Sequence, residues 1–108
     1  MRTTMLVTMF LSMGGLAIGF AAEPRLLFDG GSLAGWDVRA GEEKWWRASD
    51  GMIVGGSLTE SVPHNTFLAT KDSFSNFELA LKIRTRGGGG FVNSGIQIRS
   101  TRVPDSHE

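Results

Sequence analysis

The segment Asn93–Ser100, NSGIQIRS, combines side chains that could bind a polyhydroxylated ligand. Side chains alternate between the two faces of a strand, so Asn93, Gln97 and Arg99 would share one face, with Gly95 between them. The two isoleucines would take the opposite face. Amide and guanidinium groups are planar and offer several hydrogen bonds in fixed directions. The pattern alone does not separate a binding surface from the solvent-exposed face of an ordinary sheet.

The tryptophans are a second feature that could contact a ligand. Trp45 and Trp46 are adjacent in the sequence, so in a strand they would point to opposite faces and only one could enter a given core. An aromatic ring at a partly hydrated site offers a flat surface on which a sugar ring can stack. One of the two tryptophans could supply this surface, with simple core packing of both as the alternative.

The histidines and glycines give no sign of a metal or phosphate site. His64 lies in a Pro-Asn loop, His107 lies near the end of the chain, and no HExxH spacing is present. We expect both to be solvated loop histidines, and we expect no metal site in this segment. The run Gly87–Gly90 lacks the Lys-Ser/Thr pair of a phosphate-binding loop, so it predicts a flexible connection between strands.

The elements that would position these residues are strands. Alternation of apolar and polar residues is clearest in Asn76–Arg86, NFELALKIRTR, which predicts a half-buried strand from Phe77. The apolar residues in this run recur every second position and never at the spacings of three and four that a helix needs. We expect FVNSGIQIRS, Phe91–Ser100, to be the next strand, antiparallel to this one across the glycine loop.

Shorter strands are predicted nearer the N-terminus. Trp45–Ala48 and Met52–Val54 form a predicted hairpin joined through Ser49–Gly51, and Thr66–Lys71 is a further short strand. Asp29–Gly30 supplies the positive φ of a tight turn. Several short strands separated by turn residues predict an all-β, antiparallel sandwich.

The N-terminal residues have the three-part pattern of a secretory signal peptide. Arg2 precedes an apolar run, and small residues follow at Gly19 and Ala21. We predict cleavage after Ala21, so that residues 1–21 are the signal peptide and residues 22–108 the mature domain. An uncleaved membrane anchor is the alternative, although the run is near the minimum length for crossing a bilayer. The sequence thus predicts a secreted or periplasmic protein.

Composition limits the partners and the stabilising devices. The chain has 108 residues, 11 Lys+Arg against 11 Asp+Glu, and no cysteine. A balanced charge gives no reason to expect nucleic acid or an anionic membrane as a partner. Disulfides, thiolate metal sites and a lipid-modified cysteine are excluded. The length allows at most one domain, and we expect the chain to be the N-terminal part of a longer one.

Four blocks of sequence carry a resemblance to a known family. They are Leu27–Trp36, Trp45–Gly56, Phe67–Arg84 and Asn93–Glu108. In this order they resemble the 3-keto-disaccharide hydrolase domain family, and the combination of FDGGSLAGW with a following NSGIQIR is the most specific part. The resemblance implies a concanavalin-like jelly-roll β-sandwich, here truncated at its C-terminus.

The resemblance also implies an activity. It implies an exported hydrolase that acts on 3-keto-glycosides by abstraction of the C2 proton, elimination of the aglycone and hydration. Arg99 and Glu108 are then the candidate catalytic residues, and Asn93, Gln97 and Trp46 the candidate substrate-binding residues. No cofactor is evident in this segment, although the whole protein could use a divalent metal ion.

Two other functions are compatible with the same sequence. One is a non-catalytic, lectin-like carbohydrate-binding module, because sandwiches of this kind host both enzymes and binding domains. The other is a structural surface domain whose polar strand face contacts only water. An acid–base pair beside the polar residues favours the enzyme, and a site made only of aromatic and amide groups favours the binding module.

Overall fold

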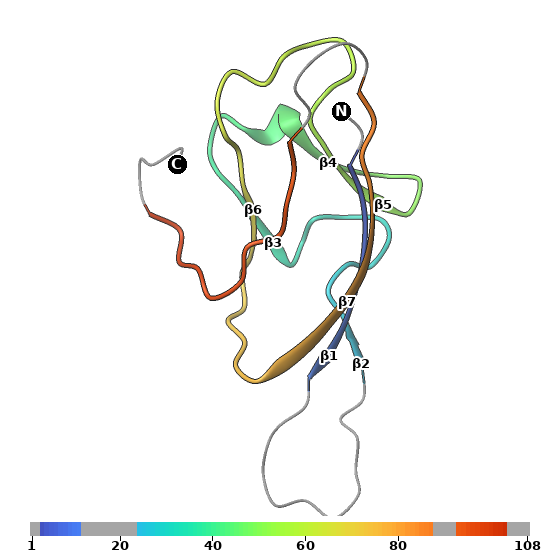
Figure 1. Cartoon of the computed structure of the whole chain (residues 1–108), viewed down its shortest axis with the longest axis vertical. Coiled ribbons are helices and arrows are strands. Elements are labelled where there is room, and N and C mark those ends of the chain that lie inside the picture. Colours follow the sequence, from blue (N-terminus) through green and yellow to red (C-terminus); the bar gives the residue numbers. More distant parts are fainter. Residues whose placement is uncertain (1–2, 12–23, 88–92, 104–108) are drawn as a thin grey trace, which may run out of the picture.

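The chain is built from short antiparallel strands connected by turns and loops (Figure 1). The computed structural model describes residues 3–11, 24–87 and 93–103. Its elements are β1 (Thr3–Leu11), β2 (Pro24–Leu26), β3 (Trp36–Val38), the 3-10 turn η1 (Glu43–Trp45), β4 (Trp46–Ser49), β5 (Met52–Gly55), β6 (Leu68–Thr70) and β7 (Phe77–Arg84). In the described part of the chain, no helix is long and apolar enough to cross a membrane.

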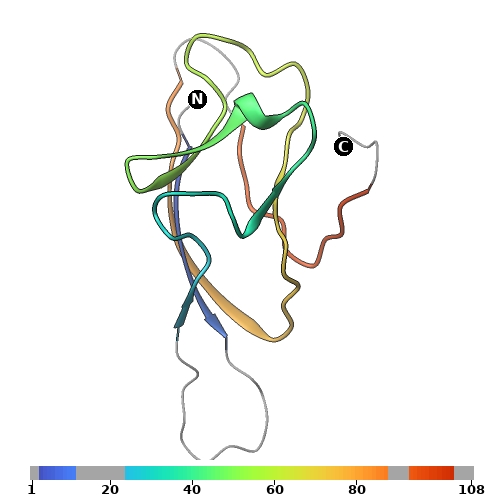
Figure 2. The same cartoon turned by 180° about the vertical axis from the view of Figure 1, so that it is seen from behind.

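Strand β1 is the centre of the larger sheet. It pairs with β7 over eight residue pairs, from Thr4 opposite Arg84 to Leu11 opposite Phe77. Its other edge is shared by β5 near its N-terminal end and by β2 near its C-terminal end. Strand β4 extends the sheet beyond β5. Figure 2, which shows the chain from behind, also places β1 alongside β7.

This placement of β1 differs from the expectation that residues 1–21 lie outside the fold. The structure describes the uncleaved chain, and in it Thr3–Leu11 forms a strand that joins β2, β5 and β7 into one sheet. The apolar composition that suggested a leader is also the composition of a central, paired strand. Cleavage after Ala21 stays a prediction.

The alternation predicted for the Phe77 strand is confirmed. Strand β7 covers Phe77–Arg84, and Phe77, Leu79 and Leu81 are half-buried while the residues between them are exposed. The pattern ends at Ile83, which is 46% exposed. The predicted neighbour was wrong, however, because β7 forms its ladder with β1 and not with Asn93–Ser100.

The prediction that Asn93–Ser100 lies in a strand was wrong. The structure assigns no strand within residues 93–103, and all side chains from Asn93 to Ser100 are exposed. Arg99 has a φ of 56°, in the left-handed region, which interrupts the extended backbone that two-residue alternation requires. A strand also needs a neighbour for its hydrogen bonds, and among the described residues nothing pairs with this segment.

Strands β4 and β5 form the predicted hairpin. Ser49 is opposite Met52, so Asp50 and Gly51 make a two-residue turn, and both have positive φ as this turn type requires. The first strand begins one residue later than predicted, because Trp45 ends the turn η1. Strand β6 lies within the predicted Thr66–Lys71.

The core joins the two sheets. Strands β3 and β6 form a separate two-stranded antiparallel sheet. The buried cluster consists of Phe28, Trp36 from β3 and Ile53 from β5, and the indole Nε1 of Trp36 donates to the carbonyl of Leu27 at 2.9 Å. Partly buried residues from both sheets pack against it: Leu27, Leu33, Trp46, Ala48, Leu68, Leu79 and Leu81. The all-β, antiparallel, partial sandwich predicted from the sequence is therefore confirmed.

The loop that leads into β3 is organised by one carboxylate. Asp29 Oδ1 accepts hydrogen bonds from the backbone N–H groups of Gly31 at 2.8 Å and Ser32 at 2.7 Å, and Oδ2 accepts one from the Ser32 hydroxyl. Gly30 has a φ of 90°, as the Asp-Gly turn predicted. The Gly31 N–H, followed by the Ser32 N–H and hydroxyl, lowers the pKa of Asp29 below its ordinary value of 3.8.

We expect Asp29→Ala to lower the stability of the chain at neutral pH and to matter less in acid. The pKa of Asp29 is depressed in the folded state, so its stabilisation is present above the unfolded pKa near 3.8 and is lost as the pH falls through the folded pKa. Melting temperatures of both proteins across pH 2 to 7 would measure this, and a difference that persists unchanged below the lowered pKa would contradict it.

The pairing of β1 with β7 predicts an effect of removing the predicted signal peptide, residues 1–21. A chain that starts at Ala22 lacks the eight-pair ladder with β7. Since each lost hydrogen bond costs about 1 kcal/mol, we expect clearly faster amide hydrogen exchange along β7 than in the full chain. Strands β3 and β6 pair with each other and not with β1, so amide exchange in these two strands is the internal control. Equal protection of β7 in both chains would show that β1 does not stabilise the sheet.

Candidate functional site

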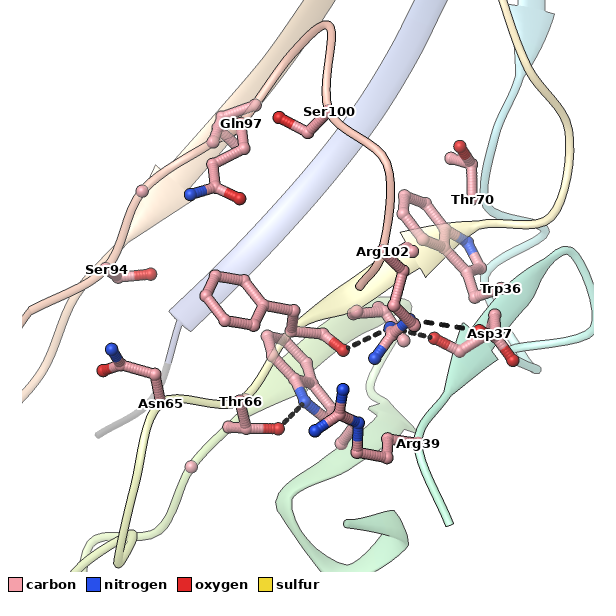
Figure 3. Close-up of a pocket in the computed structure, with 18 of the residues that line it drawn as sticks. Trp36, Asp37, Arg39, Asn65, Thr66, Thr70, Ser94, Gln97, Ser100 and Arg102 are labelled. Atoms are coloured by element: carbon pink, nitrogen blue, oxygen red, sulfur yellow. Dashed lines mark hydrogen bonds and ion pairs between the residues drawn. The ribbon is translucent and has the colours of Figure 1, made fainter. Parts of the chain in front are cut away.

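An open cavity of about 1580 Å³ lies beside the smaller sheet. Three segments line most of it: the loop Gly55–Phe67, the strand β6, and the segment Asn93–Val103, which we call the arm. Figure 3 shows Ser94 and Gln97 on the arm and Asn65 and Thr66 on the opposite loop. The lining combines hydroxyl, amide and guanidinium groups with aromatic rings, so it can take a ligand with both polar and apolar faces.

Two arginines hold the end of the arm in place. The Arg102 guanidinium donates to the carbonyl oxygens of Phe67 at 2.8 Å and Asp37 at 3.1 Å (Figure 3). Its Nε is also 3.2 Å from Asp37 Oδ2, an ion pair without hydrogen-bond geometry. Arg39 donates to the carbonyl of Val103 at 2.9 Å. The arm is thereby attached both to β3 and to the residue that precedes β6.

The three candidates on the arm all line the cavity. Asn93, Gln97 and Arg99 do so as exposed residues of an irregular segment, and not as one face of a strand. The space expected above Gly95 is present, since an added Cβ there would meet no atom within 4 Å. The fourth candidate, Glu108, lies outside the described residues.

The two adjacent tryptophans separate as expected. Trp45 is buried, whereas Trp46 is half-buried and lines the cavity. The indole Nε1 of Trp46 donates to Thr66 Oγ1 at 2.8 Å (Figure 3). Its ring lies over Gly55, the residue opposite it on β5, and an added Cβ there would be only 2.7 Å from Trp46 Cζ3. The position of this ring therefore depends on a glycine across the hairpin.

Sequence reasoning missed a buried carboxylate behind the cavity. Glu42 is almost fully buried, with 4% of its surface exposed. Its Oε2 accepts a hydrogen bond from Thr66 Oγ1 at 2.5 Å, and its Oε1 is 3.2 Å from His64 Nε2. Thr66 in turn accepts the hydrogen bond from Trp46. Burial of a carboxylate is costly unless it is hydrogen-bonded, and these contacts meet that requirement.

His64 is an exposed loop residue, as the sequence predicted, but it also has a contact that the sequence did not predict. It does lie on a loop, and 37% of its side chain is exposed, but its ring contacts the buried Glu42. Nothing in the segment GEEKWW distinguishes Glu42 from the exposed Glu43. The only available signal was the presence of a histidine and a threonine on one loop, and local sequence does not show which buried residue such a loop covers.

Across residues 3–11, 24–87 and 93–103, no three His, Cys, Asp or Glu side chains lie close enough together to hold a metal ion. The expectation that this segment has no metal site stays a prediction, because Glu108 and His107 lie outside those residues.

The fold and the cavity define an all-β domain with an open cavity lined by both aromatic and polar side chains. The comparison with protein families identifies the kind of domain. Residues 23–108 match the model of the 3-keto-alpha-glucoside-1,2-lyase-like domain, and the chain belongs to that family. The resemblance identified from the four sequence blocks is confirmed. No curated protein and no solved structure matches the chain.

The contact between Trp46 and Gly55 can be tested directly. We expect Gly55→Ala to displace the indole and to destabilise the chain by about 1–3 kcal/mol, the usual cost of overpacking. Urea unfolding and the tryptophan emission spectrum would measure the two effects. Gly95→Ala is the matched control, since its added methyl group meets open space. If the two variants had equal stabilities and emission spectra, the contact with Gly55 would not determine the position of the Trp46 indole.

Proposed function

We propose that this chain is an exported domain that binds 3-keto-glycosides in the open cavity and cleaves their glycosidic bond. The observation that carries the proposal is the match of residues 23–108 to the 3-keto-alpha-glucoside-1,2-lyase-like domain. The cavity supports it, because a half-buried indole can stack on a sugar ring while amides and hydroxyls bind its hydroxyl groups. Export rests on the predicted signal peptide.

The proposed chemistry follows from the ketone at C3 of the sugar. The carbonyl acidifies the neighbouring C2 proton, so a base in the cavity can remove it and leave an enolate. The electron pair then forms a C1–C2 double bond, and the C1–O bond breaks to release the protonated aglycone. Water adds across the double bond and gives the free 3-keto sugar. The ketone is already present in the substrate, so no electrons are exchanged.

Each candidate residue has a proposed role in this scheme. Arg99 stabilises the negative charge on the enolate oxygen, because a cation aimed at developing charge lowers the barrier. Asn93 and Gln97 hydrogen-bond sugar hydroxyls, and Trp46 supplies the stacking surface. Glu108 is the proposed acid or base that completes the catalytic set. Asn93, Gln97, Arg99 and Trp46 line the cavity, and Glu108 lies outside the described residues.

The test is release of nitrophenol from a nitrophenyl 3-keto-glucoside by the full chain. We expect Arg99→Gln to lower kcat/KM by about 10²–10³-fold, the usual effect of removing a group that stabilises an oxyanion. We expect Glu108→Gln to lower it by about 10²–10⁴-fold. Arg84→Gln is the control, because Arg84 is an exposed arginine on β7 that does not line the cavity.

The lectin-like function gives a different result in the same experiment. Calorimetric binding of the sugar without release of nitrophenol would favour the binding module, which needs the Trp46 surface but no acid or base. A chain that neither binds nor cleaves the sugar would contradict both functions. Unchanged rates for Arg99→Gln and Glu108→Gln would contradict the roles given to these two residues.

A further inference from the structure

We infer that His64 is the proton-transferring residue of the cavity and that buried Glu42 is its positioning residue. This inference rests on the proposed function and adds to it a base within the described residues. It starts from geometry: His64 lines the cavity, and its Nε2 is 3.2 Å from Glu42 Oε1. The ring thus connects a cavity open to solvent with a carboxylate that is almost completely buried.

The contact with Glu42 selects one form of the histidine ring. We assign the hydrogen of the contact to Nε2, because an ionised carboxylate can only accept hydrogen bonds. In the neutral ring the basic lone pair is then on Nδ1. When that nitrogen takes up a proton, the nearby Glu42 carboxylate stabilises the resulting imidazolium, as in other carboxylate–histidine pairs.

The other charged groups around the cavity are less suited to this task. The described carboxylates that line it are Asp37, Glu60 and Asp72, and each forms an ion pair with an arginine or a lysine. The lining arginines and lysine have no acceptor atom in their charged form. Among the described residues that line the cavity, His64 is the side chain whose ring contacts a buried carboxylate.

Glu42 also connects His64 to the proposed stacking surface. Its second oxygen accepts the Thr66 hydrogen bond, and Thr66 accepts that of the Trp46 indole. One buried carboxylate therefore fixes the histidine and, through Thr66, the tryptophan. A sugar ring bound on Trp46 would be held in a defined position relative to His64, which is the condition for efficient proton transfer.

In the resulting step His64 accepts the C2 proton of the bound 3-keto-glycoside, and the C2–H electron pair moves toward the C3 carbonyl oxygen. The imidazolium then returns this proton to the aglycone oxygen as the C1–O bond breaks. The ring has then returned to its starting state before water adds, and Glu108 remains the proposed acid or base for that addition. Protons and electrons balance without another reactant.

The kinetic test uses nitrophenol release by the full chain. We expect His64→Ala to lower kcat by about 10²–10⁴-fold, with partial rescue by added imidazole. Glu42→Gln should lower kcat between about tenfold and 10⁴-fold with little change in KM, and imidazole should not restore it. Glu43→Gln, the exposed neighbour, is the control. If the wild type is active and His64→Ala is equally fast, His64 is not the proton-transferring residue.

Nitrogen NMR of the histidine rings gives a readout that does not depend on turnover. We expect the hydrogen of neutral His64 on Nε2 in the wild type, and a changed tautomer ratio in Glu42→Gln, with Glu43→Gln unchanged. A wild-type hydrogen on Nδ1, or no change in Glu42→Gln, would overturn the positioning role. If the wild type releases no aglycone, the proposed function fails, and this measurement still decides whether Glu42 positions His64.

Discussion

The arrangement of the cavity depends on the burial of the Glu42 carboxylate. A charge removed from water must be matched by hydrogen bonds from the protein, or it destabilises the fold by several kcal/mol. The loop Gly55–Phe67 meets this demand with His64 and Thr66, and it can do so only by folding over Glu42. Thr66 also holds the Trp46 indole, so the requirements of one carboxylate determine where the loop and the aromatic surface lie.

The second wall of the cavity is fixed by a different interaction. The arm runs past the smaller sheet, and Arg102 ties its end to backbone carbonyls of Asp37 and Phe67. A guanidinium has several donors in one fixed plane, so it can hydrogen-bond two segments of the chain at once. A lysine ammonium group lacks this planar arrangement of donors. The loop is therefore positioned by the buried carboxyl group of Glu42 and the arm by the partly buried guanidinium of Arg102. Each wall is set by tertiary polar contacts, while the sheets supply the support.

What could be predicted from sequence was local in origin. The alternation of β7 and the Asp50–Gly51 hairpin follow from side-chain periodicity and from the φ values that turns require, and both are present. Strand pairing is a long-range property, and here the prediction was wrong. The arm has the composition of a strand, but β7 pairs with β1. The Glu42 network was not predictable either, because Glu42 and His64 are 22 residues apart and neither belongs to a recognisable motif.

The arm shows that side chains grouped by a wrong backbone prediction can still line one cavity. Asn93, Gln97 and Arg99 were grouped because a strand would put them on one face, yet they line the cavity from an irregular segment. Arg99 has a left-handed backbone conformation, which turns the chain. The side chains of the arm are therefore not held to the two-sided alternation of a strand. A rigid strand would give parallel side chains at a fixed spacing. On an irregular arm that is held at its end by Arg102 and Arg39, the donors are not restricted to that spacing.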